Sequence, residues 1–118
     1  MESHLHSFKS VQSIHNVDRY IQGDLDSVDL DELYDLGTPA LPALLRYAEY
    51  CEQENGVDIK KYVINDTVDR SEIKDDVAYF SALYIGAFKR DLENKKPFTA
   101  FSVPDFKAKS ALEEYLKD

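Results

Sequence analysis

The sequence predicts an all-α fold, a compact bundle of about five helices around a long central helix at residues 69–95. Apolar residues recur at helical spacing through most of the 118 residues, and capping residues or helix breakers separate the apolar segments. Hydrophobic residues make up 43% of the chain, with only 4 glycines and 4 prolines, which is typical of a packed globule. We therefore expect one helical domain at residues 13–118, after a flexible or cloning-derived segment at residues 1–12.

Two short helices are expected in the first third of the chain. The first covers residues 13–23, with Asn16 as its N-cap and Gly23 as its terminator. A turn at residues 24–28 follows, and the run DLDELYDLG then places leucine and tyrosine along one stripe of a helix at residues 29–36.

A third helix is expected to start with Thr38 as N-cap and Pro39 as its first residue, and to end at Gly56. Its apolar stripe consists of Leu41, Leu44, Leu45, Ala48 and Cys51. Residues 57–67 fit either a helical turn or a short extended piece, so we interpret them as a connector.

The longest expected helix starts at Asp69 or Ser71 and ends in the lysine pair at residues 95–96, before Pro97. Its middle, VAYFSALYIGAF, is apolar nearly all the way round, which indicates burial on several sides by the other helices. A glycine inside a helix costs about 1 kcal/mol relative to alanine. We therefore interpret Gly86 as a point where another backbone approaches closely.

A last amphipathic helix is expected near the C-terminus. Ser102 is its N-cap, and Asp105 stands at the N3 position. Its apolar stripe consists of Phe106, Ala108, Leu112 and either Tyr115 or Leu116.

The net charge of −9 belongs entirely to the first half of the chain. Residues 1–58 contain 12 acidic and 3 basic residues, whereas residues 59–118 contain 11 of each. The negative electrostatic field of the first half repels phosphates and anionic lipids, so we expect no nucleic-acid partner and no direct membrane insertion. The most apolar segment, residues 77–88, is also too short to span a bilayer. A basic protein partner would suit the charge, but a solvated acidic face that aids solubility is the favoured interpretation.

No catalytic arrangement is recognisable in the sequence. No serine stands in a nucleophile elbow, no glycine-rich phosphate loop occurs, and Cys51 has no histidine near it in sequence. We expect Cys51 to be a buried structural thiol. Asp75 and Asp76 diverge by about 100° around a helix, which is poor geometry for a shared proton. The chain is therefore not expected to be an enzyme, and a small metal-dependent enzyme is retained only as an alternative.

Two groups of residues resemble metal ligands without forming a site. His4 and His6 lie in the N-terminal segment, where adventitious binding is the simplest interpretation. The acidic run at residues 24–31 lacks the glycine and the terminal glutamate of an EF-hand loop. Carboxylates gathered at a helix N-terminus explain it. We expect no metal and no cofactor.

The candidate contact residues are Asp29, Asp31, Asp35, Tyr47 and Tyr50. Exposed tyrosines are common in protein interfaces. A tyrosine at the edge of the core, with its hydroxyl in water, is the preferred interpretation of these side chains, and an interface is the alternative.

Three stretches of the chain share residues, order and spacing with a known family. The first contains Asn16, Asp18 and Ile21 in the pattern N-x-D-x-x-I. The second contains Asp29, Asp31, Leu33, Leu36, Pro42, Ala43 and Leu44. The third contains Phe98, Phe101, Ser102, Val103, Phe106, Lys107, Ala108 and Leu112. Together they resemble the soluble C-terminal domain of the DUF4153/DUF4173 family of bacterial multi-pass membrane proteins of unknown function.

The chain departs from the family pattern in four places. Phe98 replaces a tryptophan and Ser102 an asparagine, which preserves aromatic packing and helix capping. Asp105 replaces an arginine, and the pair at residues 39–40 replaces Asp-Ala, which removes charges that a family site could use.

The resemblance implies an extramembrane domain that is membrane-associated through transmembrane helices outside this sequence, on a side that the sequence does not identify. The family supplies no established activity. Our leading hypothesis is a non-enzymatic interaction or regulatory role, with contacts to the transmembrane portion of its own parent chain, to a second copy in a homodimer, or to a soluble partner. A free-standing acidic inhibitor or immunity-type protein that binds a basic partner is the alternative.

Overall fold

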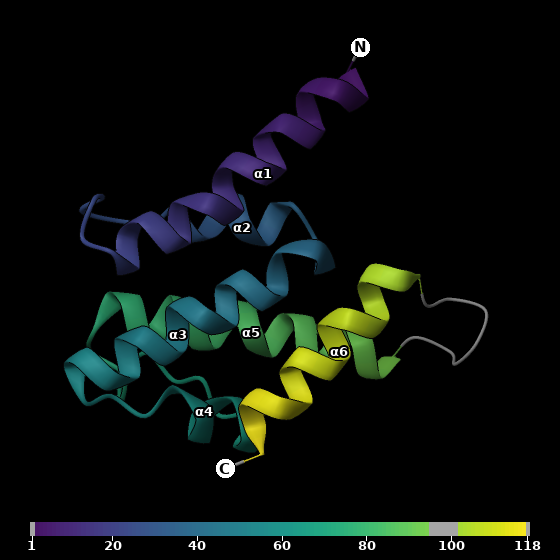
Figure 1. Cartoon of the computed structure of the whole chain (residues 1–118). Helices are drawn as coiled ribbons and strands as arrows, with labels where there is room; N and C mark the ends of the chain where they lie inside the picture. The colour runs from purple at the N-terminus through teal and green to yellow at the C-terminus, as the bar shows by residue number, and fades with distance from the viewer. Residues whose placement is uncertain (1, 95–101, 118) are drawn as a thin grey trace.

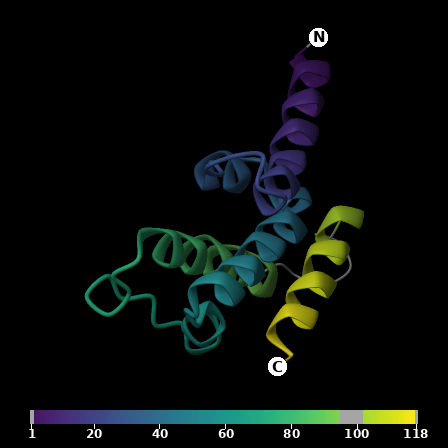
Figure 2. The same ribbon diagram turned by 60° about the vertical axis from the view of Figure 1, so that its left-hand side comes forward.

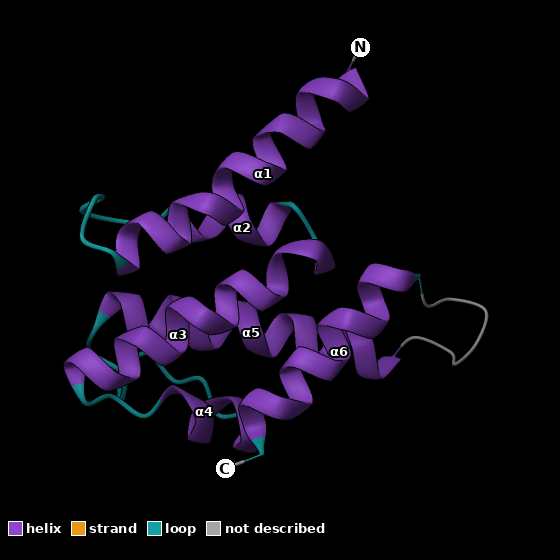
Figure 3. Ribbon diagram, in the orientation of Figure 1, coloured by secondary structure: helices purple, strands orange, loops and turns teal. Residues whose placement is uncertain are grey.

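The computed structural model describes residues 2–94 and 102–117, with side chains described from residue 11 onward. These residues form six α-helices, one short 3₁₀ helix and no strand, which confirms the predicted all-α bundle (Figures 1 and 3). In chain order the elements are α1 (Glu2–Ile21), α2 (Leu30–Asp35), η1 (Thr38–Ala40), α3 (Leu41–Asn55), α4 (Ile59–Asn65), α5 (Asp76–Asn94) and α6 (Val103–Leu116).

Two helices share the centre of the bundle. α5 packs against α2, α3, α4 and α6, as expected for a helix that is apolar on several sides, and α3 packs against α1, α2, α5 and α6. Figure 2 shows α5 and α6 flanking α3 on either side, while the N-terminal half of α1 extends beyond the other helices. No helix within the described residues is both long and apolar enough to cross a membrane.

α3 supplies a large share of the core because seven of its side chains are buried. They are Leu41, Ala43, Leu44, Leu45, Tyr47, Ala48 and Cys51. Gly56 ends the helix in the left-handed conformation at φ 70°, as the sequence predicts. The expected N-cap is wrong, because Thr38 starts η1 and its hydroxyl donates to Asp105 instead of capping α3.

α1 begins at Glu2, well before the expected start near residue 13. No proline or glycine interrupts residues 2–21, so helical hydrogen bonding continues past Asn16, which lies inside the helix and not at its N-cap. The predicted terminator is confirmed, since Gly23 has φ 90° and its N–H donates to the Tyr20 carbonyl at 3.0 Å. The helix crosses the boundary expected at residue 12, and the side chains of residues 2–10 lie outside the described part.

The expected connector at residues 57–67 contains α4. Asp58 caps this helix by accepting from the backbone N–H of Lys61 at 3.2 Å, and Asp66 ends it in the left-handed conformation. Ile59 and Val63 are its two buried residues. Two buried positions are too few to establish a helical period, so the sequence pattern does not distinguish this helix from an extended segment.

α5 begins at Asp76 and not at Asp69 or Ser71. The Asp69 carboxylate accepts from the backbone N–H of Ser71 at 2.9 Å and from its hydroxyl at 2.8 Å, so it stabilises a turn that competes with a helix. Asp75 then caps α5 by accepting from the N–H of Ala78 at 3.0 Å. The expected end of the helix at residues 95–96 lies outside the described residues.

The interpretation of Gly86 as a close-approach point is wrong. A Cβ atom built on Gly86 would meet Arg90 Nη1 at 3.9 Å, which is ordinary van der Waals contact. We therefore expect Gly86→Ala to raise the free energy of unfolding by about 1 kcal/mol, because alanine loses less backbone entropy on folding.

Urea unfolding followed by circular dichroism measures this change. Gly56→Ala is the matched control, and it should destabilise the fold because Gly56 has a φ of 70° that alanine adopts only with strain. A loss of stability in Gly86→Ala would show that α5 has less room at this position than its backbone indicates.

Candidate functional site

A groove lies between the N-terminal end of α2 and the first turns of α5, with α3 beneath it. It encloses about 290 Å³. Its lining residues are Ser27, Val28, Asp29, Leu30, Asp31, Tyr47, Asp76, Val77, Phe80 and Tyr84. We call this cavity the α2–α5 groove. It brings together three segments that are far apart in the sequence.

The start of α2 supplies one acidic rim of the groove. Asp29 is the N-cap, and its carboxylate accepts from the backbone N–H of Glu32 at 3.0 Å. Asp31 follows in the first turn, where the helix dipole favours negative charge. The acidic run therefore stabilises a helix start, as the sequence predicts, and it also places two carboxylates beside the groove.

α5 supplies an aromatic wall that continues onto α2. Phe80 and Tyr84 stack with ring centroids 6.2 Å apart and an interplanar angle of 25°. Tyr84 stacks in turn on Tyr34 at 4.9 Å and 23°. The Phe80 side chain is 40% exposed, so a large apolar ring remains in contact with water beside the carboxylates.

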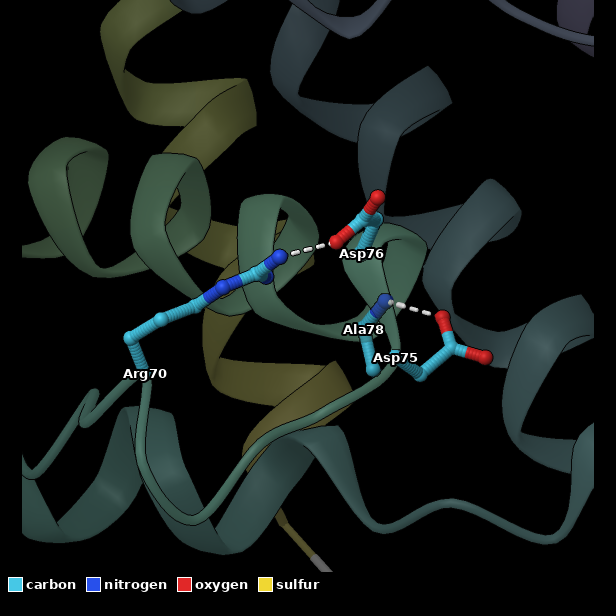
Figure 4. Close-up of polar contacts among 4 residues, drawn as sticks. All are labelled: Arg70, Asp75, Asp76 and Ala78. Carbon is cyan, nitrogen blue, oxygen red and sulfur yellow. Dashed lines mark hydrogen bonds and ion pairs between the residues drawn. The ribbon is translucent and has the colours of Figure 1, made fainter.

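Two polar contacts hold the walls of the groove. The Tyr84 hydroxyl donates to Asp31, which joins α5 to α2. Arg70 reaches from the segment before α5 and pairs with Asp76 (Figure 4). Its guanidinium carbon also lies 4.7 Å from the ring centroid of Tyr79 and 6.0 Å from that of Phe80.

Asp75 and Asp76 point to different partners, as the sequence predicts. In Figure 4 the Asp75 side chain turns toward the backbone N–H of Ala78, while Asp76 faces Arg70. The two carboxylates therefore do not form a proton-sharing dyad.

The floor of the groove is Tyr47, which packs at 5.3 Å between ring centroids against Tyr20. Burial raises the pKa of the Tyr47 hydroxyl, and the neighbouring Cys51 raises it further. Cys51 is buried, and burial also raises the pKa of its thiol. Both groups therefore stay protonated at neutral pH, and Cys51 is the buried thiol that the sequence predicts.

The structure brings three of the five candidate contact residues to one place. Asp29, Asp31 and Tyr47 line the α2–α5 groove, whereas Asp35 and Tyr50 do not. Tyr47 is only 2% exposed, so the prediction that it contacts a partner from the surface is wrong. Tyr50 is half-buried, with its ring edge against Tyr20 at 5.7 Å, which agrees with a position at the core edge.

Sequence reasoning missed the α5 side of the groove. Asp76, Phe80 and Tyr84 recur at intervals of four residues, which places them on one face of a helix. This spacing was the available signal. It was obscured because the surrounding segment is apolar on every side.

No metal centre is evident among the side chains at residues 11–94 and 102–117, where no three histidine, cysteine or acidic residues gather closely enough to hold an ion. His4 and His6 lie outside this part of the chain. His15 is exposed on α1.

Comparisons with protein-family models, with curated proteins and with solved structures give no match to this chain. The resemblance to the DUF4153/DUF4173 family therefore stays a prediction based on the three stretches of sequence described above.

Proposed function

We propose that this chain is a non-enzymatic interaction domain that binds a basic segment of a partner protein in the α2–α5 groove. The observation that carries the proposal is the groove itself, which Asp29, Asp31 and Asp76 line together with the exposed Phe80 ring.

The charge distribution supports a basic partner. All of the net charge of −9 belongs to residues 1–58, which include the α2 rim of the groove. An acidic surface of this kind attracts cationic partners over a distance and raises their association rate. The aromatic wall then supplies apolar contact for the methylene groups of lysine and arginine side chains.

The groove supports binding more strongly than catalysis. Its volume of about 290 Å³ is at the lower end for a small-molecule site and suits one or two side chains of a peptide. The pKa of Tyr47, on the floor of the groove, is shifted away from neutrality. A general base or a nucleophile needs a pKa that is shifted toward neutrality.

The family resemblance supports a membrane context for the interaction. In that context the proposed partner is the parent chain itself. Lysine and arginine are concentrated in the cytoplasmic loops of membrane proteins, so this version of the proposal also places the domain on the cytoplasmic side. A free-standing acidic inhibitor of a basic protein would use the same groove and is the alternative. A coding sequence that continues upstream into several transmembrane helices would eliminate the free-standing inhibitor.

A matched pair of double variants tests the groove. The probe is a fluorescent peptide in which arginine and lysine alternate with glycine, and the measurement is fluorescence anisotropy at low and at physiological salt. Asp31→Asn with Asp76→Asn removes two rim charges and should weaken binding about tenfold. Asp24→Asn with Asp35→Asn removes the same charge from exposed positions outside the groove and should change binding less than about twofold.

Equal reductions in affinity in both double variants would contradict the proposal, because binding would then follow net charge and not the groove. Asp31→Asn also weakens the hydrogen bond that the Tyr84 hydroxyl donates to this side chain. Thermal melting of each variant therefore checks that the domain remains folded.

A further inference from the structure

We infer that the α2–α5 groove selects arginine over lysine, with the partner's guanidinium lying against Phe80 and Tyr84 and pairing with Asp31 and Asp76. This inference rests on the proposed function, because it names the side chain that the basic segment places in the groove.

The shape of the aromatic wall favours a planar cation. Phe80 and Tyr84 both line the groove and stack at an interplanar angle of 25°, so their rings are nearly parallel, while Tyr34 stacks on Tyr84 at 23° from outside the groove. A guanidinium is planar and stacks on such a surface. An ammonium group is a compact, strongly hydrated charge that gains less from it.

The placement of the carboxylates favours a cation with several donors. Asp31 Oδ1 accepts a hydrogen bond from the Tyr84 hydroxyl, and Asp76 Oδ1 accepts one from the Arg70 guanidinium. Each carboxylate has a second oxygen that can accept from a ligand. The two carboxylates come from different helices on either side of the cavity. A guanidinium carries five N–H donors in a fork, which allows it to pair with carboxylates on both sides at once.

The chain already binds one of its own arginines in this manner. Arg70 pairs with Asp76 while its guanidinium carbon lies 4.7 Å from the Tyr79 centroid and 6.0 Å from the Phe80 centroid. Arg70 is not among the residues that line the groove, although Asp76 and Phe80, which it contacts, both are. Among the described side chains, the two lysines that lie over aromatic rings each contact a single ring and not a stacked pair. Lys60 lies 5.0 Å from the Tyr115 centroid and Lys61 lies 5.0 Å from the Tyr62 centroid, both away from the groove.

Two peptides of equal length and equal charge test the inference. One contains arginine as its only cationic residue and the other contains lysine, and binding of each to the full chain is measured by isothermal titration calorimetry. We expect the arginine peptide to bind about tenfold tighter. Phe80→Leu keeps an apolar side chain but removes the ring, and it should reduce the ratio of the two affinities to about twofold.

The possible outcomes separate the inference from the proposed function. Equal affinity for the two peptides, with binding of both weakened about tenfold in Asp31→Asn/Asp76→Asn, would overturn the arginine preference and leave the proposed function standing. Selectivity that persists in Phe80→Leu would overturn the aromatic part of the inference. Absence of binding by either peptide would overturn the inference together with the proposed function.

Discussion

Replacing Glu52 by alanine should lower the free energy of unfolding by about 3 kcal/mol. The Glu52 carboxylate accepts from the backbone N–H of Ile59 at 3.0 Å and of Lys60 at 3.2 Å. These two donors at the start of α4 have no partner within the helix, so Glu52 supplies it. Its other oxygen accepts from the Tyr115 hydroxyl at 3.0 Å, near the end of α6. One side chain on α3 therefore holds two other helices, and alanine removes the acceptor for three donors.

Urea unfolding of two further variants isolates the cause. Glu52→Gln keeps one acceptor oxygen and should lose about half as much stability as Glu52→Ala. Glu49→Ala changes an exposed glutamate on the same helix and should cost less than about 0.5 kcal/mol. A loss of stability below about 1 kcal/mol in Glu52→Ala would contradict the conclusion that Glu52 holds α4 and α6 against α3.

Asp105→Ala should lower the free energy of unfolding by about 2 to 3 kcal/mol. Asp105 is 4% exposed and completes the predicted capping box, accepting from the backbone N–H of Ser102 at 3.1 Å. It also accepts from the Thr38 hydroxyl at 2.7 Å, which ties the start of α6 to η1. The same residue thus caps one helix and fixes it to another element.

A double-mutant cycle separates these two roles. Thr38→Val removes the hydroxyl and leaves the capping box intact, so it should cost about 1 kcal/mol alone and almost nothing in the Asp105→Ala background. Additive effects in the cycle would show that the hydrogen bond from Thr38 to Asp105 does not contribute to stability.

The elements predicted well are those with unambiguous terminators. Gly23 and Gly56 both adopt positive φ where the sequence places a helix end, and Ser102 caps α6 as expected. The helix starts were less predictable. Asp69 and Asp75 are both acceptable N-caps, and only the tertiary structure determines that Asp69 forms a turn with Ser71 while Asp75 starts α5.

The groove was only partly predictable because the α5 segment is apolar on every side. Hydrophobic periodicity assigns Phe80 and Tyr84 to the core, yet the residues that α5 buries include small ones such as Ala78 and Ala82. Small residues fit against neighbouring helices, and the larger rings remain at the groove. Periodicity reports which residues are apolar but does not identify the face of an all-apolar helix that meets the core.

The most direct test of the groove as a binding site is an NMR titration of the ¹⁵N-labelled domain with the mixed arginine and lysine peptide. We expect progressive amide shifts confined to residues 27–31 and 76–84, on the two sides of the α2–α5 groove. Shifts centred on another surface, or the absence of any shift up to millimolar peptide, would contradict the assignment of this groove as the binding site.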